Sequence, residues 1–270
     1  MSRAFYLYDA FAERPGEGNP AALLPCTAFP SEPAMAAVAG ELNAWTAFLV
    51  EAEEGWQVRT YSLPPVVPSP ACGHALLAAA ALILGRLRPG AERVTLTTPA
   101  LAVTAARGAG GWFAIDLPAI ACDPVSPDLL PAPVRDGLGG AIREVAKRRE
   151  GYPAWILRYD SAAALSALPR APELLRGLEA LVLATAPGVE EDLASRLFQP
   201  MKSLIEDPAG GTQHALAAPF WADRLGRRAL TARSCSARGG RCRLALQGAR
   251  VLIEAPVAAV AEGRLTGLLG

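Results

Sequence analysis

The sequence predicts an α+β protein with two lobes, each built mainly from antiparallel strands. Three observations support this fold class. Short strand-like segments recur along the whole chain, fewer helical patterns lie between them, and a proline-rich stretch divides the chain near its middle. With 270 residues, the chain is long enough for each lobe to bury a hydrophobic core of its own.

The predicted strands are short runs rich in apolar residues, and glycine, proline or acidic residues bound each of them. Their density along the chain favours antiparallel pairing, because a parallel pair needs a long crossover connection. The predicted strands are residues 4–10, 46–51, 57–61, 93–97, 112–117, 155–159, 180–185, 243–246 and 250–253.

Apolar residues recur with helical spacing in five other segments, which are residues 31–42, 73–86, 171–178, 190–198 and 213–225. Two largely apolar helices follow a glycine-bearing turn, one at Gly73 and one at Gly211. This repeated plan is consistent with a duplicated lobe, although alanine richness alone can produce the same similarity. At the level of sequence, the duplication therefore stays open.

Five prolines lie between residues 118 and 133, as expected of a connector between two lobes. We therefore predict an N-terminal lobe of residues 1–117 and a C-terminal lobe of residues 118–270. This division leaves open whether the last strand pairs with the sheet of the first lobe.

The charge balance argues against nucleic acid and membrane surfaces as partners, because the chain has 26 basic and 26 acidic residues and hence no net charge. Arginines gather in residues 224–250, but no aromatic residues accompany them to stack on bases, so we interpret the cluster as a solvated strand face. The apolar run at 75–84 is shorter than the about 20 residues that cross a bilayer. No signal-peptide pattern opens the chain, and we expect a cytoplasmic location.

The chain has five cysteines at scattered spacings, no C-x-x-C pair and two histidines. This pattern predicts reduced thiols and no structural zinc site. We also expect no cofactor and no catalytic metal.

Several short motifs follow one another along the chain. They are Asp9-Ala10-Phe11 with Arg14-Pro15 and Gly18-Asn19-Pro20, Glu41-Leu42-Asn43, Cys72-Gly73-His74-Ala75, Glu206-Asp207-Pro208 with Gly211-Thr212, Pro219-Phe220-Trp221, and Ser236 with Arg238-Gly239-Gly240. In order and spacing they resemble the PhzF family of phenazine biosynthesis, which is related to diaminopimelate epimerase. The resemblance covers about residues 6–265.

The resemblance implies two pseudo-symmetric lobes, each a bent antiparallel sheet (a β-roll) around a central helix, with a small-molecule site between the lobes. Members of the family move a proton on small carboxylates without a cofactor, and homodimers are usual. The implied protein is thus an isomerase that tautomerises a small, cyclic, amino-acid-like carboxylate by a 1,3-shift. The pathway would be a specialised one, such as natural-product or antibiotic biosynthesis.

Two helix starts supply the expected site residues. The first-turn N–H groups of such a helix lack intrahelical partners, and a preceding glycine lets a carboxylate approach them. By resemblance, His74 and Asp207 are catalytic, and we add Cys72 as a third candidate. Expected substrate-binding residues are Gly73, Gly211, Thr212, Trp45 and Thr46.

One departure from the family pattern changes the expected chemistry. After Glu-Leu-Asn the family continues with Leu-Ser-Glu-Thr, and that glutamate is its principal acid/base. Here Trp45 or Thr46 stands at the glutamate position, depending on the alignment. The catalytic carboxylate is absent, and Asp207, His74 or Cys72 would have to replace it.

Two alternatives remain open beside the isomerase. In epimerase and racemase relatives a cysteine at the position of Cys72 is a catalytic thiol, and a related dehydratase group pairs such a cysteine with threonine, as Cys72 and Thr212 would here. The other alternative is a small-molecule-binding homologue that lost catalysis together with the glutamate.

Overall fold

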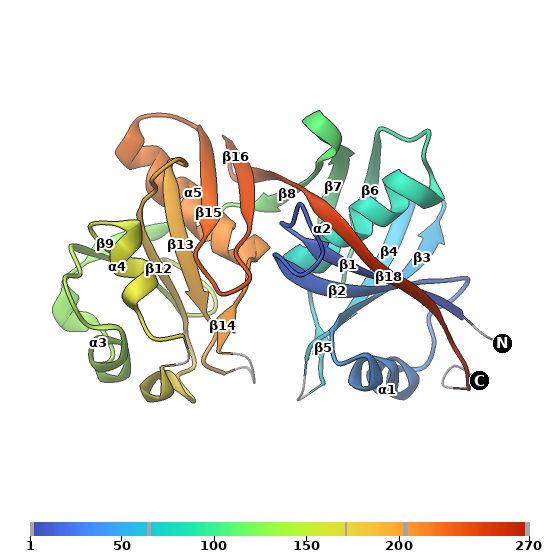
Figure 1. Cartoon of the computed structure of the whole chain (residues 1–270), viewed down its shortest axis with the longest axis horizontal. Coiled ribbons are helices and arrows are strands. Elements are labelled where there is room, and N and C mark those ends of the chain that lie inside the picture. The colour runs from blue at the N-terminus through green and yellow to red at the C-terminus, as the bar shows by residue number, and fades with distance from the viewer. Residues whose placement is uncertain (1–2, 64–65, 171, 202–204, 268–270) are drawn as a thin grey trace. The chain divides into compact units, whose positions relative to one another are not determined.

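The computed structural model describes residues 3–63, 66–170, 172–201 and 205–267 (Figure 1). It divides into unit 1, with residues 1–116 and 254–270, and unit 2, with residues 117–253. The last strand, β18, lies in unit 1 because it pairs antiparallel with β1. The division thus departs from the predicted lobes of 1–117 and 118–270 mainly at the C-terminal end.

The sheet of unit 1 runs in the order β18, β1, β2, β3, β4, β6, β7 and β8. Neighbouring strands are antiparallel except for two parallel pairs, β2 with β3 and β4 with β6. The short β5 also pairs with β4. The strands are β1 (Arg3–Ala10), β2 (Asn19–Cys26), β3 (Trp45–Ala52), β4 (Gly55–Tyr61), β5 (Pro68–Ser69), β6 (Arg93–Thr97), β7 (Ala102–Arg107), β8 (Phe113–Pro118) and β18 (Val257–Leu265).

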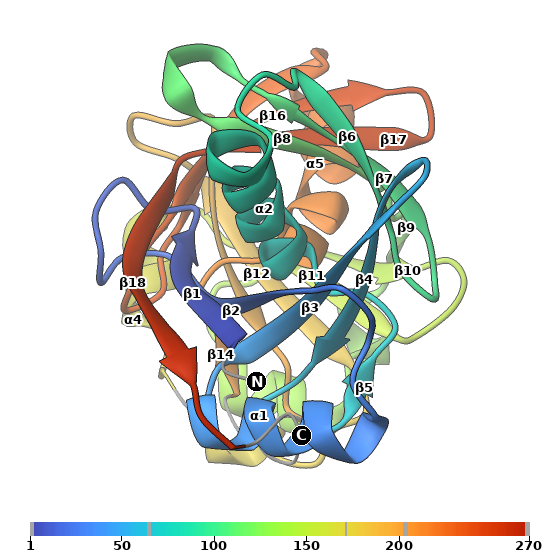
Figure 2. The ribbon, with the colours of Figure 1, turned by 90° about the vertical axis from the view of Figure 1, so that its right-hand side faces the viewer.

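The helix α2 (Gly73–Leu82) is the central element of unit 1. Every residue from His74 to Leu82 is buried, as expected for a helix that is apolar on all sides. It contacts β1, β2, β3, β7 and β18, and Figure 2 shows it among these strands. A π-helical turn (Ile83–Leu87) extends it.

A second helix, α1 (Glu32–Leu42), packs against β3 and β4. Ser31 caps its first turn by accepting a hydrogen bond from the Ala34 N–H, and Asn43 ends it in a left-handed conformation. Met35, Val38 and Ala39 of α1 form a hydrophobic cluster with Phe48 of β3 and other residues of this face.

The sheet of unit 2 runs in the order β9, β10, β11, β12, β13, β15 and β16, with β14 on β13. The helix α5 (Gly211–Leu225) contacts β12, β13, β15 and β16, and α4 (Ala162–Ala167) contacts β12 and β13. The other elements are α3 (Ala132–Leu138), β9 (Cys122–Val125), β10 (Glu144–Arg148), β11 (Ala154–Arg158), β12 (Leu181–Pro187), β13 (Leu193–Phe198), β14 (Glu206–Asp207), β15 (Ala229–Ser234), β16 (Arg241–Gln247) and β17 (Arg250–Ala255).

The two units repeat one plan of strand pairing. From β1 to β7 in unit 1, and from β10 to β16 in unit 2, successive pairs are antiparallel, parallel, antiparallel, parallel and antiparallel. The central helices α2 and α5 occupy equivalent places in this order. The predicted α+β fold with pseudo-symmetric lobes is confirmed, and the two parallel pairs in each sheet are an addition to it.

Two predicted helices are wrong. Residues 193–198 form β13, whose side chains are all buried and which pairs with β12 and β15. Of residues 171–178, Glu173–Leu175 form only a 3-10 turn, and residue 171 lies outside the described residues. Within the expected connector, β9 pairs with β10, so this stretch is part of unit 2.

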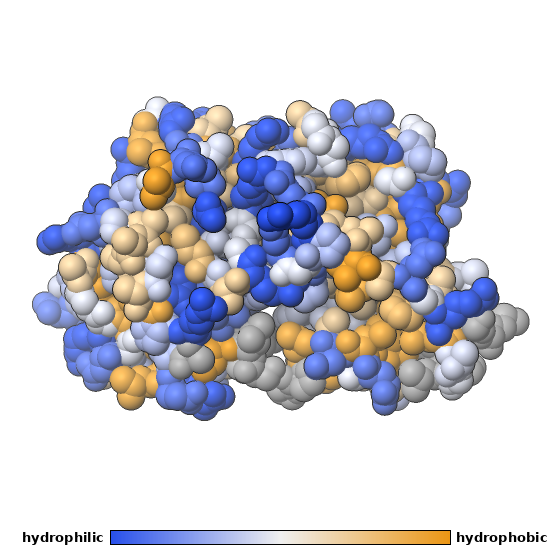
Figure 3. Space-filling view, in the orientation of Figure 1, coloured by the Kyte–Doolittle hydropathy of each residue, from blue (hydrophilic) through white to orange (hydrophobic). Residues whose placement is uncertain are grey.

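Hydrophilic and apolar residues alternate over the face seen in Figure 3. Among the helices that the structure describes, none has both the length and the apolar character that crossing a membrane requires.

Candidate active site

Cys72 and His74 meet at the start of α2. Cys72 precedes the helix in an extended conformation, with φ −139° and ψ 105°, and its side chain does not cap the helix. Its Sγ instead lies 3.4 Å from Nδ1 and 3.7 Å from Nε2 of His74. Both side chains are buried, with 6% of Cys72 and 3% of His74 exposed. The thiol and the imidazole therefore form one buried polar pair.

His74 is neutral in this environment. Burial lowers the pKa of His74 to about 3, while a hydrogen bond to the backbone of Pro20 acts in the opposite direction. Because proline has no N–H, its carbonyl must accept this bond from a ring N–H of His74. The other ring nitrogen of the neutral imidazole is then an acceptor, which suits the neighbouring thiol.

Pro20, whose carbonyl accepts the hydrogen bond from His74, lies at the end of the motif that begins at Asp9. Asp9 is 2% exposed, and its Oδ2 accepts a hydrogen bond of 2.8 Å from the Gly16 N–H. Gly18 has φ +58°, and a Cβ there would lie 2.1 Å from the Ala10 carbonyl oxygen, so the turn requires glycine. Asp9 and Pro20 face each other in the β1–β2 ladder. The motif at 9–20 thus places Pro20 on β2 beside the central helix.

Trp45 rather than Thr46 lies against His74. The two rings meet edge to face, with centroids 5.6 Å apart and an interplanar angle of 86°. Thr46 is fully buried and pairs with Tyr61, which belongs to the hydrophobic cluster with α1. Neighbouring strand residues point to opposite faces, so Trp45 and Thr46 diverge.

The hydroxyl of Thr46 donates a hydrogen bond of 2.9 Å to the Ala44 carbonyl. This placement argues against Thr46 as a substrate-binding residue. Of these two neighbouring residues, Trp45 is the one that contacts His74.

In unit 2, Asp207 lies beside the start of α5. Its Oδ2 accepts a hydrogen bond from the Gln199 amide. A Cβ on Gly210 would lie 2.9 Å from the same oxygen, so a larger residue there would displace the carboxylate. Gly211 is the buried first residue of α5, and Thr212 follows it half-buried. The structure thus brings together Asp207, Gly211 and Thr212 as it brings together Trp45, Cys72, Gly73 and His74 in unit 1.

Three buried polar groups near α5 were missed in the sequence. Gln213 donates from its amide to the hydroxyls of Ser195 and Ser234, each at 2.9 Å. The second histidine, His214, donates from Nδ1 to the Gly210 carbonyl at 2.8 Å. Burial lowers the pKa of His214 to about 4. The proximity of these residues to the motif at 206–212 is a signal that could have identified them.

The third group is the ion pair of Arg196 and Glu206, with side chains 2% and 9% exposed. Arg196 lies in the segment that was predicted as a helix. Arg196 is the one charged residue of the otherwise uncharged run Leu193–Phe198, and this is the signal that could have marked it.

Unit 2 also contains a pocket of about 640 Å³. It lies between α4, the turn at 189–191 and residues 233–239. None of the predicted site residues lines it. All five cysteines lie among the described residues and none forms a disulfide. Among the residues that the structure describes, no group of three or more His, Cys, Asp or Glu side chains is placed to hold a metal ion.

A family model described as "Phenazine biosynthesis-like protein" matches residues 8–251. A relative from Pseudomonas aeruginosa, named an uncharacterized isomerase, is 34% identical over 98% of this chain and 99% of its own.

Two solved structures are also similar. A PhzF-family phenazine biosynthesis protein from Enterococcus faecalis has a TM-score of 0.89 and 27% identity, covering 98% of this chain and 100% of that one. A probable proline racemase from Agrobacterium radiobacter, solved with bound carbonate, has a TM-score of 0.64 at 12% identity, covering 98% of this chain and 93% of that one. The latter likeness concerns the fold alone.

Proposed function

The chain belongs to the phenazine biosynthesis-like PhzC-PhzF family, and from this premise we propose that it is a cofactor-independent isomerase of small, cyclic, amino-acid-like carboxylates. The proposed reaction is a tautomerisation in which a proton leaves one carbon and returns at a conjugated carbon. The coarser assignment, an isomerase-like protein, follows from relatives that are named isomerases.

The buried pair of Cys72 and His74 is the observation that carries this proposal. Its two side chains lie 3.4 Å apart at the start of a helix, where unpaired N–H groups favour a carboxylate. The neutral imidazole cannot serve as a strong base, because burial holds the pKa of His74 near 3. We therefore assign to the pair a role in binding and orienting the substrate.

Asp207 is the residue that we assign to the proton transfer. Its carboxylate takes the proton from the carbon next to the substrate carboxylate, and the electron pair of the broken C–H bond moves into the conjugated system. The first-turn N–H groups of α5, the helix beside Asp207, stabilise the resulting enolate-like charge. Asp207 then returns the proton to the conjugated carbon, so that atoms and charge balance.

Trp45 suits a flat substrate. It provides an apolar ring surface next to His74, where the family motif has a carboxylate. A substrate whose C–H is already acidic, such as an imine-conjugated ring, needs less from the base.

Solvent exchange tests this proposal. The probe is 1-pyrroline-5-carboxylate in D₂O, and ¹H NMR follows deuterium uptake at the ring carbon that bears the carboxylate. We expect the protein to accelerate uptake, Asp207→Asn to reduce the acceleration at least 100-fold, and Cys72→Ser to change it only a few-fold. Binding of the probe without any acceleration would contradict the isomerase and favour a non-catalytic binding homologue.

A racemase- or dehydratase-like reaction is the second candidate, and the contact between the Cys72 thiol and the His74 ring favours it. In that case Cys72 is the base, with Thr212 as its partner. L-Proline in D₂O is the probe, and deuterium at the α-carbon with formation of D-proline is the readout. Loss of this activity in Cys72→Ser but not in Asp207→Asn would support the second candidate.

Three finer proposals accompany the activity: a specialised biosynthetic pathway, such as that of a natural product or antibiotic, a homodimer, and a cytoplasmic location. Sedimentation equilibrium measures the assembly directly. A molecular mass near that of the 28.2 kDa chain would contradict the dimer.

A further inference from the structure

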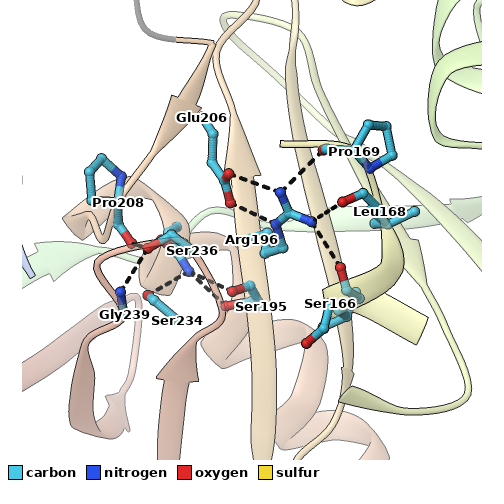
Figure 4. Close-up of polar contacts among 12 residues, drawn as sticks. Ser166, Leu168, Pro169, Ser195, Arg196, Glu206, Pro208, Ser234, Ser236 and Gly239 are labelled. Atoms are coloured by element: carbon cyan, nitrogen blue, oxygen red, sulfur yellow. Dashed lines mark hydrogen bonds and ion pairs between the residues drawn. The ribbon is translucent and has the colours of Figure 1, made fainter. Parts of the chain in front are cut away.

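Arg196 uses all of its hydrogen-bonding capacity inside unit 2. Its Nε and Nη2 donate to the two carboxylate oxygens of Glu206, at 2.6 and 2.9 Å. Nη1 donates to the carbonyls of Leu165 and Leu168, at 2.9 and 2.7 Å, and Nη2 donates to that of Pro169 at 3.2 Å. These contacts, part of which Figure 4 shows, occupy the five N–H groups that a guanidinium possesses.

Arg196 therefore links two elements that lie far apart in the sequence. The three carbonyls lie in the last turn of α4 and directly after it, where a cation is favoured by the helix dipole. Glu206 belongs to β14, which has only two residues and two ladder positions on β13. Because so few backbone pairings hold β14, the side chain of Glu206 contributes much of its attachment.

Ser236 anchors the other side of the same segment. Its hydroxyl donates a hydrogen bond of 2.6 Å to the Pro208 carbonyl and accepts one of 3.1 Å from the Gly239 N–H (Figure 4). The residues immediately before and after Asp207 are thus both attached through side chains, one to Arg196 and one to Ser236.

The geometry points to Arg196, Glu206 and Ser236 as positioning residues that hold the Asp207 carboxylate against Gly210 at the start of α5. This inference rests on the proposed function, in which Asp207 moves the proton. A carboxylate that must stay within hydrogen-bonding distance of a C–H tolerates little displacement, since misplacement by about 1 Å can reduce a rate by about 100-fold.

The alternative is that the ion pair only stabilises the fold. A buried ion pair can often be replaced by apolar residues without loss of stability, whereas removal of one partner leaves a buried charge. The double variant R196M/E206L therefore removes the attachment while leaving no unpaired charge. Ser236→Ala removes the second attachment and also introduces no charge.

The experiment compares R196M/E206L, Ser236→Ala and the wild-type protein. Glu144→Gln is the matched control, because Glu144 pairs with Arg224 elsewhere in unit 2. ¹³C NMR of aspartate-labelled protein reports the Asp207 carboxyl, identified by its loss in Asp207→Asn, and ¹⁵N NMR reports the amides of Gly210 and Gly211. Urea unfolding measures stability, and the pyrroline exchange assay gives kcat and KM.

We expect both test variants to shift the Asp207, Gly210 and Gly211 resonances and to lower kcat at least 10-fold, with KM changed less than 3-fold. Glu144→Gln should leave both these resonances and kcat unchanged. Resonances that match the wild type in Ser236→Ala and in R196M/E206L would overturn the inference, and so would a change in urea stability alone. If R196M/E206L fails to fold, Ser236→Ala decides.

The NMR readout does not depend on the proposed function. A wild-type protein without exchange activity would contradict the isomerase, while shifted resonances in the variants would still support the positioning of Asp207.

Discussion

Trp45 is one of the two residues expected at the position of the family's glutamate, and its ring contacts His74 edge to face. Thr46, one residue later, faces the opposite side of β3 and is fully buried. The two neighbouring positions therefore differ in whether they tolerate a charged side chain. A carboxylate at position 45 would lie beside an imidazole, whereas at position 46 it would lie in an apolar interior.

Substitution by glutamate tests this difference. We expect Trp45→Glu to raise the pKa of His74 from about 3, because a nearby carboxylate favours the charged imidazole. Thr46→Glu should lower the free energy of unfolding by about 3 kcal/mol or more, because it buries an unpaired charge. NMR titration of the His74 ring and urea unfolding measure the two effects. Equal destabilisation by both substitutions would contradict the assigned faces of β3.

At the scale of single elements, the proline within α5 has an identifiable partner. Pro219 has no N–H, so it cannot bond to the Ala215 carbonyl four residues earlier. The Ile120 N–H donates to that carbonyl instead, at 3.0 Å. The proline thus leaves the Ala215 carbonyl available to accept a hydrogen bond from the segment that follows β8.

Pro219→Ala should weaken this attachment. The new N–H competes for the Ala215 carbonyl, and we expect amide exchange at Ile120 to become about 10-fold faster, equivalent to the loss of about one hydrogen bond. Amide hydrogen exchange by NMR measures this rate. The neighbouring Ala119 N–H, which bonds to the Ala249 carbonyl at 2.8 Å, is the internal control. Unchanged exchange at Ile120 would show that the proline does not maintain the contact.

Element types could be predicted where the local pattern was long and unambiguous. The helices at 31–42 and 213–225 were predicted nearly to their ends, and nine strand segments correspond to β1, β3, β4, β6, β8, β11, β12, β16 and β17. Residues 193–198 lie in the segment 190–198, for which the spacing of apolar residues predicts a helix. Pairing on both edges, with β12 and β15, decides in favour of a strand there.

At the scale of the whole molecule, the two histidines predict a pH dependence of stability. The pKa values of His74 and His214 are about 3 and about 4 in the folded protein, below the ordinary value of 6.5. Their contribution is fully present above pH 6.5, and it is lost as the pH falls toward the folded pKa values, because the unfolded chain binds the protons first. Each histidine contributes a slope of up to about 1.4 kcal/mol per pH unit.

We therefore expect the free energy of urea unfolding to fall between pH 6.5 and pH 4.5, a range that lies above the ordinary carboxylate pKa values. The double variant His74→Gln with His214→Asn should show a much smaller slope in this range. An equal slope in the variant would mean that the histidines are not buried neutral.

The C-terminal strand predicts a second effect on the whole molecule. β18 pairs with β1 from Arg3 to Ala10, so removing residues 257–270 exposes the edge of β1. We expect amide exchange in β1 and β2 to become at least 10-fold faster by mass spectrometry, with β12 and β13 unaffected. A chain ending at residue 265 retains β18 and serves as the control. Equal acceleration in both units would contradict the assignment of β18 to unit 1 alone.

The sequence by itself determined the α+β class and the family motifs with their order, and it predicted the absence of the usual glutamate, because these depend on local periodicity and on residue identity. It also identified Cys72, His74 and Asp207 as candidates. Only the tertiary structure decided that Trp45 rather than Thr46 meets His74, that His74 is neutral, and that Arg196 attaches the segment carrying Asp207. These features depend on burial and on partners from distant segments, which no local pattern encodes.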